Sequence, residues 1–280
     1  MVVSLIQALW LGLVQGLTEF LPVSSSGHLA VVQALLGVQP GLAFDILLHL
    51  GTLVAVLVVY WSQVVRLVQA AVSLVWPASW PAEDRAGRQR NLRLLAGLII
   101  GSVPAALAGL FLEKQVEGLF TELRVVGILF WVTALFLIMA DLKARHAAVD
   151  EPERVPTPGQ ALVVGIGQAL ALPPGISRSG TTVFFALLAG LPREQAADFS
   201  FLLSIPVIAG AGVLSIPDLI RSGTGGATPW GTYLAGFGMA ALAGYAAIRL
   251  LLSLIRRARL TVFSAYLFAL GALILLGWLK

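Results

Sequence analysis

The chain has 280 residues, of which 58% are hydrophobic and only 11% are charged, and its mean hydropathy is +0.92. A water-soluble protein of this length does not need so much apolar sequence, so the composition predicts an integral membrane protein. The net charge of +4 lies in the loops, which favours contact with anionic lipid headgroups and argues against nucleic-acid binding. The lack of cysteine excludes disulfides, iron–sulfur clusters and thiolate zinc sites.

Apolar runs of sufficient length predict six full spans, because a helix needs about 20 residues to cross about 30 Å of hydrocarbon. These spans are expected at residues 52–76, 94–112, 125–142, 199–217, 231–253 and 260–279. Residues 1–38 and 157–191 are also apolar, but clusters of Pro, Gly and Ser interrupt both of them. Each of these two regions is predicted to be a re-entrant hairpin, in which a polar loop joins two short helices.

Basic residues in the connecting segments predict the orientation of the chain. Arg and Lys concentrate in residues 77–93, 143–156 and 256–259, which the positive-inside rule places in the cytoplasm. The loops at 113–124 and 218–230 are then external. With six spans between them, the first hairpin enters the membrane from outside and the second enters from the cytoplasm.

The two broken regions also resemble each other in sequence. Residues 8–29 align without a gap on residues 161–182, at an offset of 153, and both stretches contain Ser-x-Ser-Gly. The same offset pairs Asp45 with Asp198. We therefore predict one all-α membrane domain, 1–280, made of repeat one (1–153) and repeat two (154–280). Each repeat has a hairpin and three spans, and the second copy is inverted, as in many transporter folds.

The two serine-rich loops are expected to face each other, because irregular backbone at membrane depth must be buried in protein or line a wet cavity. Each loop opens a half-helix whose free amides favour anions. The polar side chains that the two loops contribute are Glu19, Ser24, Ser25, Ser26, His28, Ser177, Arg178, Ser179, Thr181 and Thr182. Because arginine offers a fork of donors, this set predicts a site for phosphate or pyrophosphate.

The stretches "QGLTEFLPVSSSGHL" and "PGISRSGTT" resemble the motifs of the undecaprenyl-pyrophosphate phosphatase family, the membrane enzymes associated with bacitracin resistance. The resemblance extends over the whole chain. It implies hydrolysis of a polyprenyl pyrophosphate to the monophosphate, which recycles the cell-wall lipid carrier at the bacterial inner membrane. It also implies a divalent cation, Mg²⁺ or Ca²⁺. The positions that match the family's functional residues are Glu19, Ser25, His28, Ser177, Arg178 and Thr182.

Four of these residues, Glu19, Ser25, His28 and Arg178, are expected to carry catalysis. An ionisable group at the bilayer centre costs at least about 2.5–3.5 kcal/mol, which favours a functional role for Glu19 and Arg178. The candidate substrate-binding hydroxyls are those of Ser24, Ser26, Ser177, Ser179, Thr181 and Thr182. For Ser24, Ser26 and Ser179 the alternative is a structural role, in which the hydroxyl satisfies nearby backbone groups.

The metal is expected on Glu19, with Gln15, Asp45 and Asp198 as further candidate ligands. Gln15 occupies the first position of the Glu/Gln-xxx-Glu element, where the family also uses glutamate, so Glu19 must do more of the metal binding. His49 has no partner that the sequence identifies, and we expect it to be structural.

The sequence leaves three nucleophiles open. Ser25 attacks after losing its proton to His28, or His28 attacks directly, or His28 activates water. It also leaves open a lipid-phosphate transporter or flippase with the same anion pocket, and whether the protein forms a homodimer. A carboxylate aimed at an anion has no use in a pure binding site unless a metal or proton intervenes, which favours hydrolysis. We expect the site to open to the external, periplasmic side, because the first hairpin carries a carboxylate and a histidine, which need water and metal more than the arginine and serines of the second hairpin do.

Overall fold

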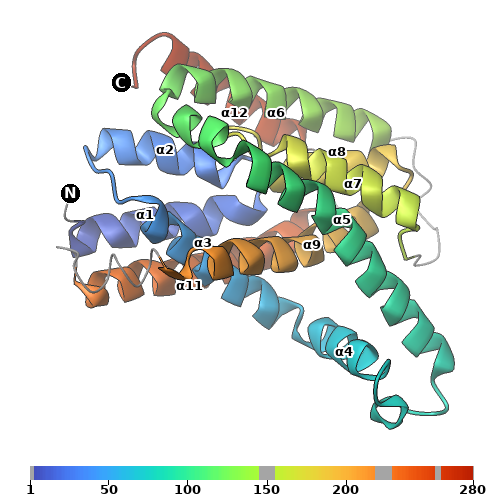
Figure 1. The fold of residues 1–280 in the computed structure, drawn as a ribbon. Helices are drawn as coiled ribbons and strands as arrows, with labels where there is room; N and C mark the ends of the chain where they lie inside the picture. Colours follow the sequence, from blue (N-terminus) through green and yellow to red (C-terminus); the bar gives the residue numbers. More distant parts are fainter. Residues whose placement is uncertain (1–2, 145–154, 218–228, 256–259, 280) are drawn as a thin grey trace.

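The computed structural model describes residues 3–144, 155–217, 229–255 and 260–279, and every regular element in these ranges is helical. Figure 1 shows the helices as one elongated bundle, with α4 and the start of α5 projecting from it. The helices are α1 Leu5–Phe20, α2 Ser25–Leu35, α3 Leu42–Val59, α4 Trp61–Val72, η1 Pro77–Ser79, α5 Arg85–Glu117, η2 Gly118–Thr121, α6 Leu123–Ala144, α7 Pro158–Leu170, α8 Arg178–Leu188, α9 Arg193–Leu214, α11 Trp230–Ile255 and α12 Thr261–Leu275.

Several of the helices are long and apolar enough to cross a membrane. Within the described residues these are α5 over Arg85–Leu112, α6, α9 and α11 over Trp230–Leu252. The pair α3 and α4 passes the same test jointly, and α12 is a shorter apolar helix. The prediction of an all-α, multi-pass membrane protein is therefore confirmed.

The single span expected at residues 52–76 is wrong in its bounds. The apolar helix α3 already begins at Leu42, and the axis turns by 86° between α3 and α4. The reason is a change of pattern at Tyr60. Beyond it, Gln63, Arg66 and Gln69 recur at helical spacing, so α4 has one polar face and does not continue the wholly apolar α3.

Both broken regions form the expected pairs of short helices, α1 with α2 and α7 with α8. Each pair opens with a capping box, in which Ser4 exchanges hydrogen bonds with Gln7 and Thr157 exchanges them with Gln160. The two boxes are again 153 residues apart. In Figure 1, α1 begins at the left end of the bundle and α7 begins at the right end, so the two hairpins enter from opposite sides.

Each hairpin packs against a long helix from the other half of the sequence. Helix α1 lies along α11 and α7 lies along α5. Glycine allows this close approach: a Cβ on Gly165 would lie 2.5 Å from the carbonyl oxygen of Gly101, and a Cβ on Gly12 would clash with the carbonyl of Gly236. An inverted duplication would produce such an exchange, and the division into repeats at residue 153 stays a prediction.

Candidate active site

The tips of the two hairpins meet inside the bundle. The amide of Gly175 donates to the hydroxyl of Ser24 over 3.1 Å, and the hydroxyl of Ser179 donates to the carbonyl of Leu21 over 3.0 Å. Ser24 has a φ of 69°, in the left-handed region that residues other than glycine seldom adopt. The expected convergence of the two serine loops is therefore what the structure contains.

Helix α6 supports the second tip from behind. The hydroxyl of Thr133 donates to the carbonyl of Gly175 over 2.8 Å and accepts from the amide of Ser177 over 3.0 Å. Thr133 is fully buried, so these bonds satisfy polar groups that have no access to water. One side chain thus holds both ends of the turn that leads into α8.

The two half-helices begin in the same way. Ser24 and Ser177 are N-caps, and their hydroxyls accept from the amides of Gly27 and Gly180. As a result, Ser25 is the first residue of α2 and Arg178 is the first residue of α8. The first position of the second half-helix therefore carries a hydroxyl in the first hairpin, Ser25, and a guanidinium in the second hairpin, Arg178.

The carboxylate of Glu19, near the end of α1, is the centre at which these groups meet. Its Oε1 accepts from Nη2 of Arg178 over 2.6 Å. Its Oε2 accepts from the hydroxyl of Ser25 over 2.5 Å and from Nε2 of Gln15 over 2.8 Å. Nε2 of His49 lies 3.6 Å from the same oxygen. Glu19 is only 6% exposed, so this carboxylate is held by protein groups and not by bulk water.

His28 lies apart from this centre. Its Nδ1 lies 2.8 Å from the carbonyl oxygen of Ser24, and its Nε2 lies 2.7 Å from the hydroxyl of Tyr266 on α12. The hydroxyl of Ser25 donates to Glu19, and not to His28 as the first of the three open alternatives for the nucleophile would require. Of the four predicted catalytic residues, the structure joins Glu19, Ser25 and Arg178 directly.

Most of the other predicted hydroxyls already have protein partners. Ser24, Ser177 and Ser179 are used in the caps and in the contact between the tips, as the structural alternative expected for Ser24 and Ser179. Thr182 donates to the carbonyl of Arg178 over 2.8 Å and pairs with the hydroxyl of Ser200 on α9.

Two of the predicted substrate-binding hydroxyls have few or no hydrogen-bond partners in the described structure. Ser26 is half-buried, with its hydroxyl 3.3 Å from that of Ser24. Thr181 is buried, and its hydroxyl has no hydrogen-bond partner within the described structure.

The amino-acid sequence of the chain is similar to those of known proteins. The chain matches the family model described as bacitracin resistance protein BacA over residues 8–273. The chain belongs to this family. It is 43% identical to the undecaprenyl-diphosphatase of Rubrobacter xylanophilus over 97% of both chains. It is 38% identical to that of Methanosphaera stadtmanae over 96% of both, and 42% identical to that of Carboxydothermus hydrogenoformans over 96% of this chain and 95% of the other.

Two residues of this BacA-family protein reach the site although sequence reasoning did not place them there. His49 was expected to be structural, yet its ring faces Glu19. The signal that points to it is an ionisable side chain within an apolar span, which is costly unless it is used. Tyr266 has no such signal, because 238 residues separate it from His28.

The residues around Glu19 fit a metal that is shared with a phosphate. The described residues contain no group of three or more His, Asp or Glu side chains that could hold a metal ion. Asp45 accepts from Gln33 and Asp198 accepts from Tyr60, so both have other partners. Magnesium, however, is often bound by one or two protein oxygens together with substrate phosphates and water.

Gln15 offers one of those protein oxygens. Its Oε1 is buried and has no hydrogen-bond partner in the described structure, while its Nε2 already donates to Glu19. An amide oxygen is a hard ligand of the kind that Mg²⁺ and Ca²⁺ take. With the amide turned so that its oxygen and not its nitrogen faces Glu19, Gln15 and Glu19 together match an open metal site better than a closed protein cage.

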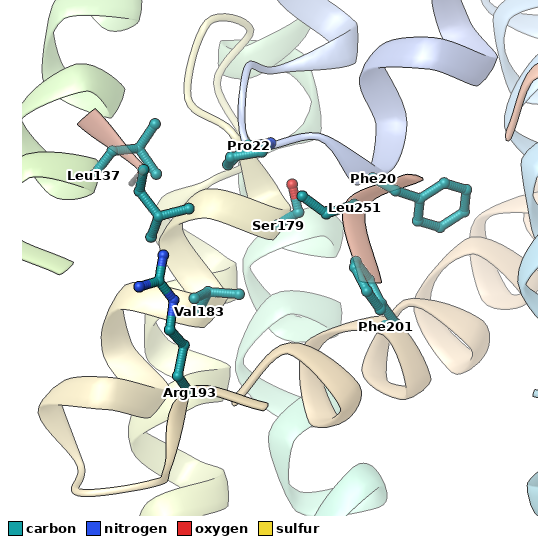
Figure 2. A pocket seen from close by; sticks show the side chains of 9 residues that line it. Phe20, Pro22, Leu137, Ser179, Val183, Arg193, Phe201 and Leu251 are labelled. Atoms are coloured by element: carbon teal, nitrogen blue, oxygen red, sulfur yellow. The ribbon is translucent and has the colours of Figure 1, made fainter. Parts of the chain in front are cut away.

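A small pocket lies beside the hairpin tips, among α1, α6, α8, α9 and α11. Figure 2 shows Pro22 and Ser179 on one side of it, with the guanidinium of Arg193 reaching toward it from another. The remaining walls are apolar and include Phe20, Leu137, Val183 and Phe201. Because neither Glu19 nor Arg178 lines it, this pocket does not account for the binding of a pyrophosphate.

Proposed function

We propose that this BacA-family protein is an undecaprenyl-diphosphatase, which hydrolyses a polyprenyl pyrophosphate in the membrane to the monophosphate and free phosphate. The observation that carries the proposal is the set of three groups on Glu19, namely the hydroxyl of Ser25, the amide of Gln15 and the guanidinium of Arg178. The names of the relatives supply the substrate class.

Arg178 and the two half-helix starts bind the pyrophosphate. The first backbone amides of a helix have no intrahelical partner and favour an anion. Helices α2 and α8 both start at the hairpin tips, which contact each other, so their first amides lie at the same place. Arg178 provides a planar fork of donors for two phosphate oxygens. In the absence of an anion, the fork is held by Glu19, so substrate binding exchanges one anionic partner for another.

Ser25 is the nucleophile that the contacts favour, with Glu19 as its base. The Ser25 hydroxyl donates its proton toward Oε2 of Glu19, while His28 is engaged elsewhere. Attack forms a bond between the Ser25 oxygen and the terminal phosphorus, the bridging P–O bond breaks, and polyprenyl monophosphate leaves. Glu19 takes the serine proton. Water then hydrolyses the phosphoserine, with His28 close to the same loop as the proton acceptor.

A divalent cation, Mg²⁺ or Ca²⁺, is part of the proposal. Glu19 and the unpaired Oε1 of Gln15 would hold it. It would neutralise charge on the pyrophosphate oxygens. The protein contributes the arrangement of these two oxygens on one face of α1, four residues apart.

The site is assigned to the external side of the bacterial inner membrane. In Figure 1, α1 begins and α12 ends at one end of the bundle, and α5 begins at the other. The start of α5 carries Arg85, Arg88, Arg90 and Arg93, which the positive-inside rule assigns to the cytoplasm. Hairpin α1–α2, with Glu19 and His28, then opens outward. The partners in this setting are the lipid substrate and the surrounding membrane lipids.

Release of phosphate by purified protein in detergent tests the proposal, because no gradient exists there to drive transport. The assay uses undecaprenyl pyrophosphate with Mg²⁺ or Ca²⁺, and measures inorganic phosphate against a Ser25→Ala control. Multiple turnovers of the wild-type protein are expected. Binding of the lipid without phosphate release would reject hydrolysis and favour the transporter alternative.

A further inference from the structure

A hydrogen bond from the last described helix reaches the first hairpin. The hydroxyl of Tyr266 on α12 lies 2.7 Å from Nε2 of His28 on α2, and the two rings stack at 5.6 Å with an interplanar angle of 14°. Helix α2 otherwise packs mainly on α1 and α6, and α12 packs on α6. The phenol is thus a specific contact between two helices that share little other packing.

The partners of His28 determine which nitrogen carries the proton. A backbone carbonyl can only accept, so Nδ1 must donate to the carbonyl of Ser24. In the neutral ring, Nε2 is then the acceptor, and the hydroxyl of Tyr266 donates to it. Because a hydroxyl can rotate, the same phenol can accept from Nε2 once the ring is protonated.

The environments of the two residues fit this arrangement. His28 is 8% exposed, so its polar atoms need protein partners, and the hydroxyl of Tyr266 is one of them. The ring of Phe130 on α6 lies beside the imidazole, with ring centroids 5.1 Å apart and the two planes tilted by 55°. The imidazole is therefore surrounded by a carbonyl, a phenol and a phenyl ring.

We infer that Tyr266 both positions His28 and relays a proton to it: its hydroxyl donates to the Nε2 lone pair, which holds the imidazole in the Nδ1–H form. This inference rests on the proposed phosphatase function. Because the phenol occupies the one lone pair of Nε2, the imidazole activates water through Tyr266: the phenol oxygen accepts a proton from water as the phenol's own proton passes to Nε2. The described hydrogen bonds of Tyr266 include neither Glu19 nor Arg178, so its proposed role is distinct from theirs.

Tyr266→Phe removes the hydroxyl and keeps the ring that stacks on His28. The expected result is a fall in kcat of roughly tenfold or more with an unchanged KM, because proton transfer depends on a correctly held ring while Arg178 remains in place. The matched control is Tyr245→Phe on α11, whose residue is similarly exposed at 43% and lies outside the site. That control is expected to retain wild-type kcat and KM.

Two further measurements separate positioning from a structural role. In a His28→Ala background, Tyr266→Phe is expected to cause no additional loss of residual activity, since its effect passes through the imidazole. Nitrogen-15 NMR of histidine-labelled protein, with His28→Ala to assign the signal among the three histidines of the chain, is expected to show an Nδ1–H imidazole that changes in Tyr266→Phe. The spectrum does not require activity.

An unchanged kcat together with an unchanged imidazole spectrum in folded Tyr266→Phe would overturn the inference. A full additional loss in the His28→Ala background would overturn it as well, because Tyr266 would then act by another route. If the wild-type protein releases no phosphate, the proposed function fails, and the imidazole spectrum alone decides whether Tyr266 sets the state of His28.

Discussion

Arg178, the first residue of α8, donates to the carboxylate of Glu19 near the end of α1 over 2.6 Å. A single charged side chain at membrane depth costs free energy, and pairing the carboxylate with the guanidinium lowers that cost for both. The pairing also means that the site without substrate is already neutralised. A pyrophosphate must compete with Glu19 for the guanidinium, and Oε1 of the carboxylate is then available to a cation while Oε2 still accepts from Ser25.

Arg178→Lys should lose most of the activity although it keeps the charge. A single ammonium cannot reproduce the two-point contact of a guanidinium with phosphate, so kcat/KM should fall on the order of tenfold to a hundredfold, a loss of about 1.4–2.7 kcal/mol. Steady-state phosphate release measures it. Arg90→Lys, at an exposed position of α5, is the control and should be unaffected. Near-normal turnover in folded Arg178→Lys would rule out the bidentate contact.

Ser25→Ala should abolish turnover while the protein remains folded. The substitution removes the proposed nucleophile, so the rate should drop by at least about a thousandfold. Thr18→Ala is the control, because its hydroxyl donates to the carbonyl of Val14 within the same helix and does not reach the site. If Ser25→Ala retains a large fraction of the wild-type rate, water or His28 is the nucleophile.

Glu19→Gln should reduce both the rate and the response to metal. The new amide cannot take the proton of Ser25, and without a general base the rate should fall about 10²–10⁴-fold. The substitution also removes the carboxylate that, with Gln15, would bind the metal. Titration of Mg²⁺ or Ca²⁺ against phosphate release measures both effects. Full activity with an unchanged metal requirement would place the cation elsewhere, and Asp45 and Asp198 would be the next ligands to test.

Gly165→Ala should destabilise the fold. The new methyl group would lie 2.5 Å from the carbonyl oxygen of Gly101, so α7 must move away from α5, at a cost of about 1–3 kcal/mol. Thermal unfolding in detergent measures the change. Gly159→Ala, near the start of the same helix, is the control, because its Cβ would have no neighbour within 4 Å. Equal melting temperatures for the two variants would contradict the tight contact.

Ser26→Cys should react with a membrane-impermeant thiol reagent added outside intact cells. Ser26 is the half-buried serine of the first tip, between the buried Ser25 and Gly27, and the chain has no other cysteine. Labelling is read by a mass shift or a fluorescent tag. Reaction confined to inverted vesicles would reverse both the orientation and the side at which hydrolysis is assigned.

The features that the sequence predicted are those that depend on local pattern. Apolar length and loop charge indicated a multi-pass helical protein, and the interrupted runs at 1–38 and 157–191 indicated two hairpins. The predicted span at 52–76 had the wrong bounds, because the mean hydropathy of that stretch combines the end of α3 with the whole of α4. The bend at Tyr60 follows from a change in the spacing of polar residues, which a mean value does not show. The carboxylate of Glu19 and the guanidinium of Arg178 stood out from local pattern as well, since ionisable groups in apolar sequence are costly.

What only the tertiary structure decided is which of these groups meet. Residues 19 and 178 are brought together by two hairpins that enter from opposite ends, and glycine contacts such as Gly165 with Gly101 position those hairpins. The partner of Ser25 proved to be Glu19, while His28 pairs with Tyr266 on a helix 238 residues away. Hydrogen bonds are directional and short in range, so the choice between such partners depends on backbone placement to within about an ångström. A motif specifies the residue types in a site, and the packing of distant helices determines which atoms they face.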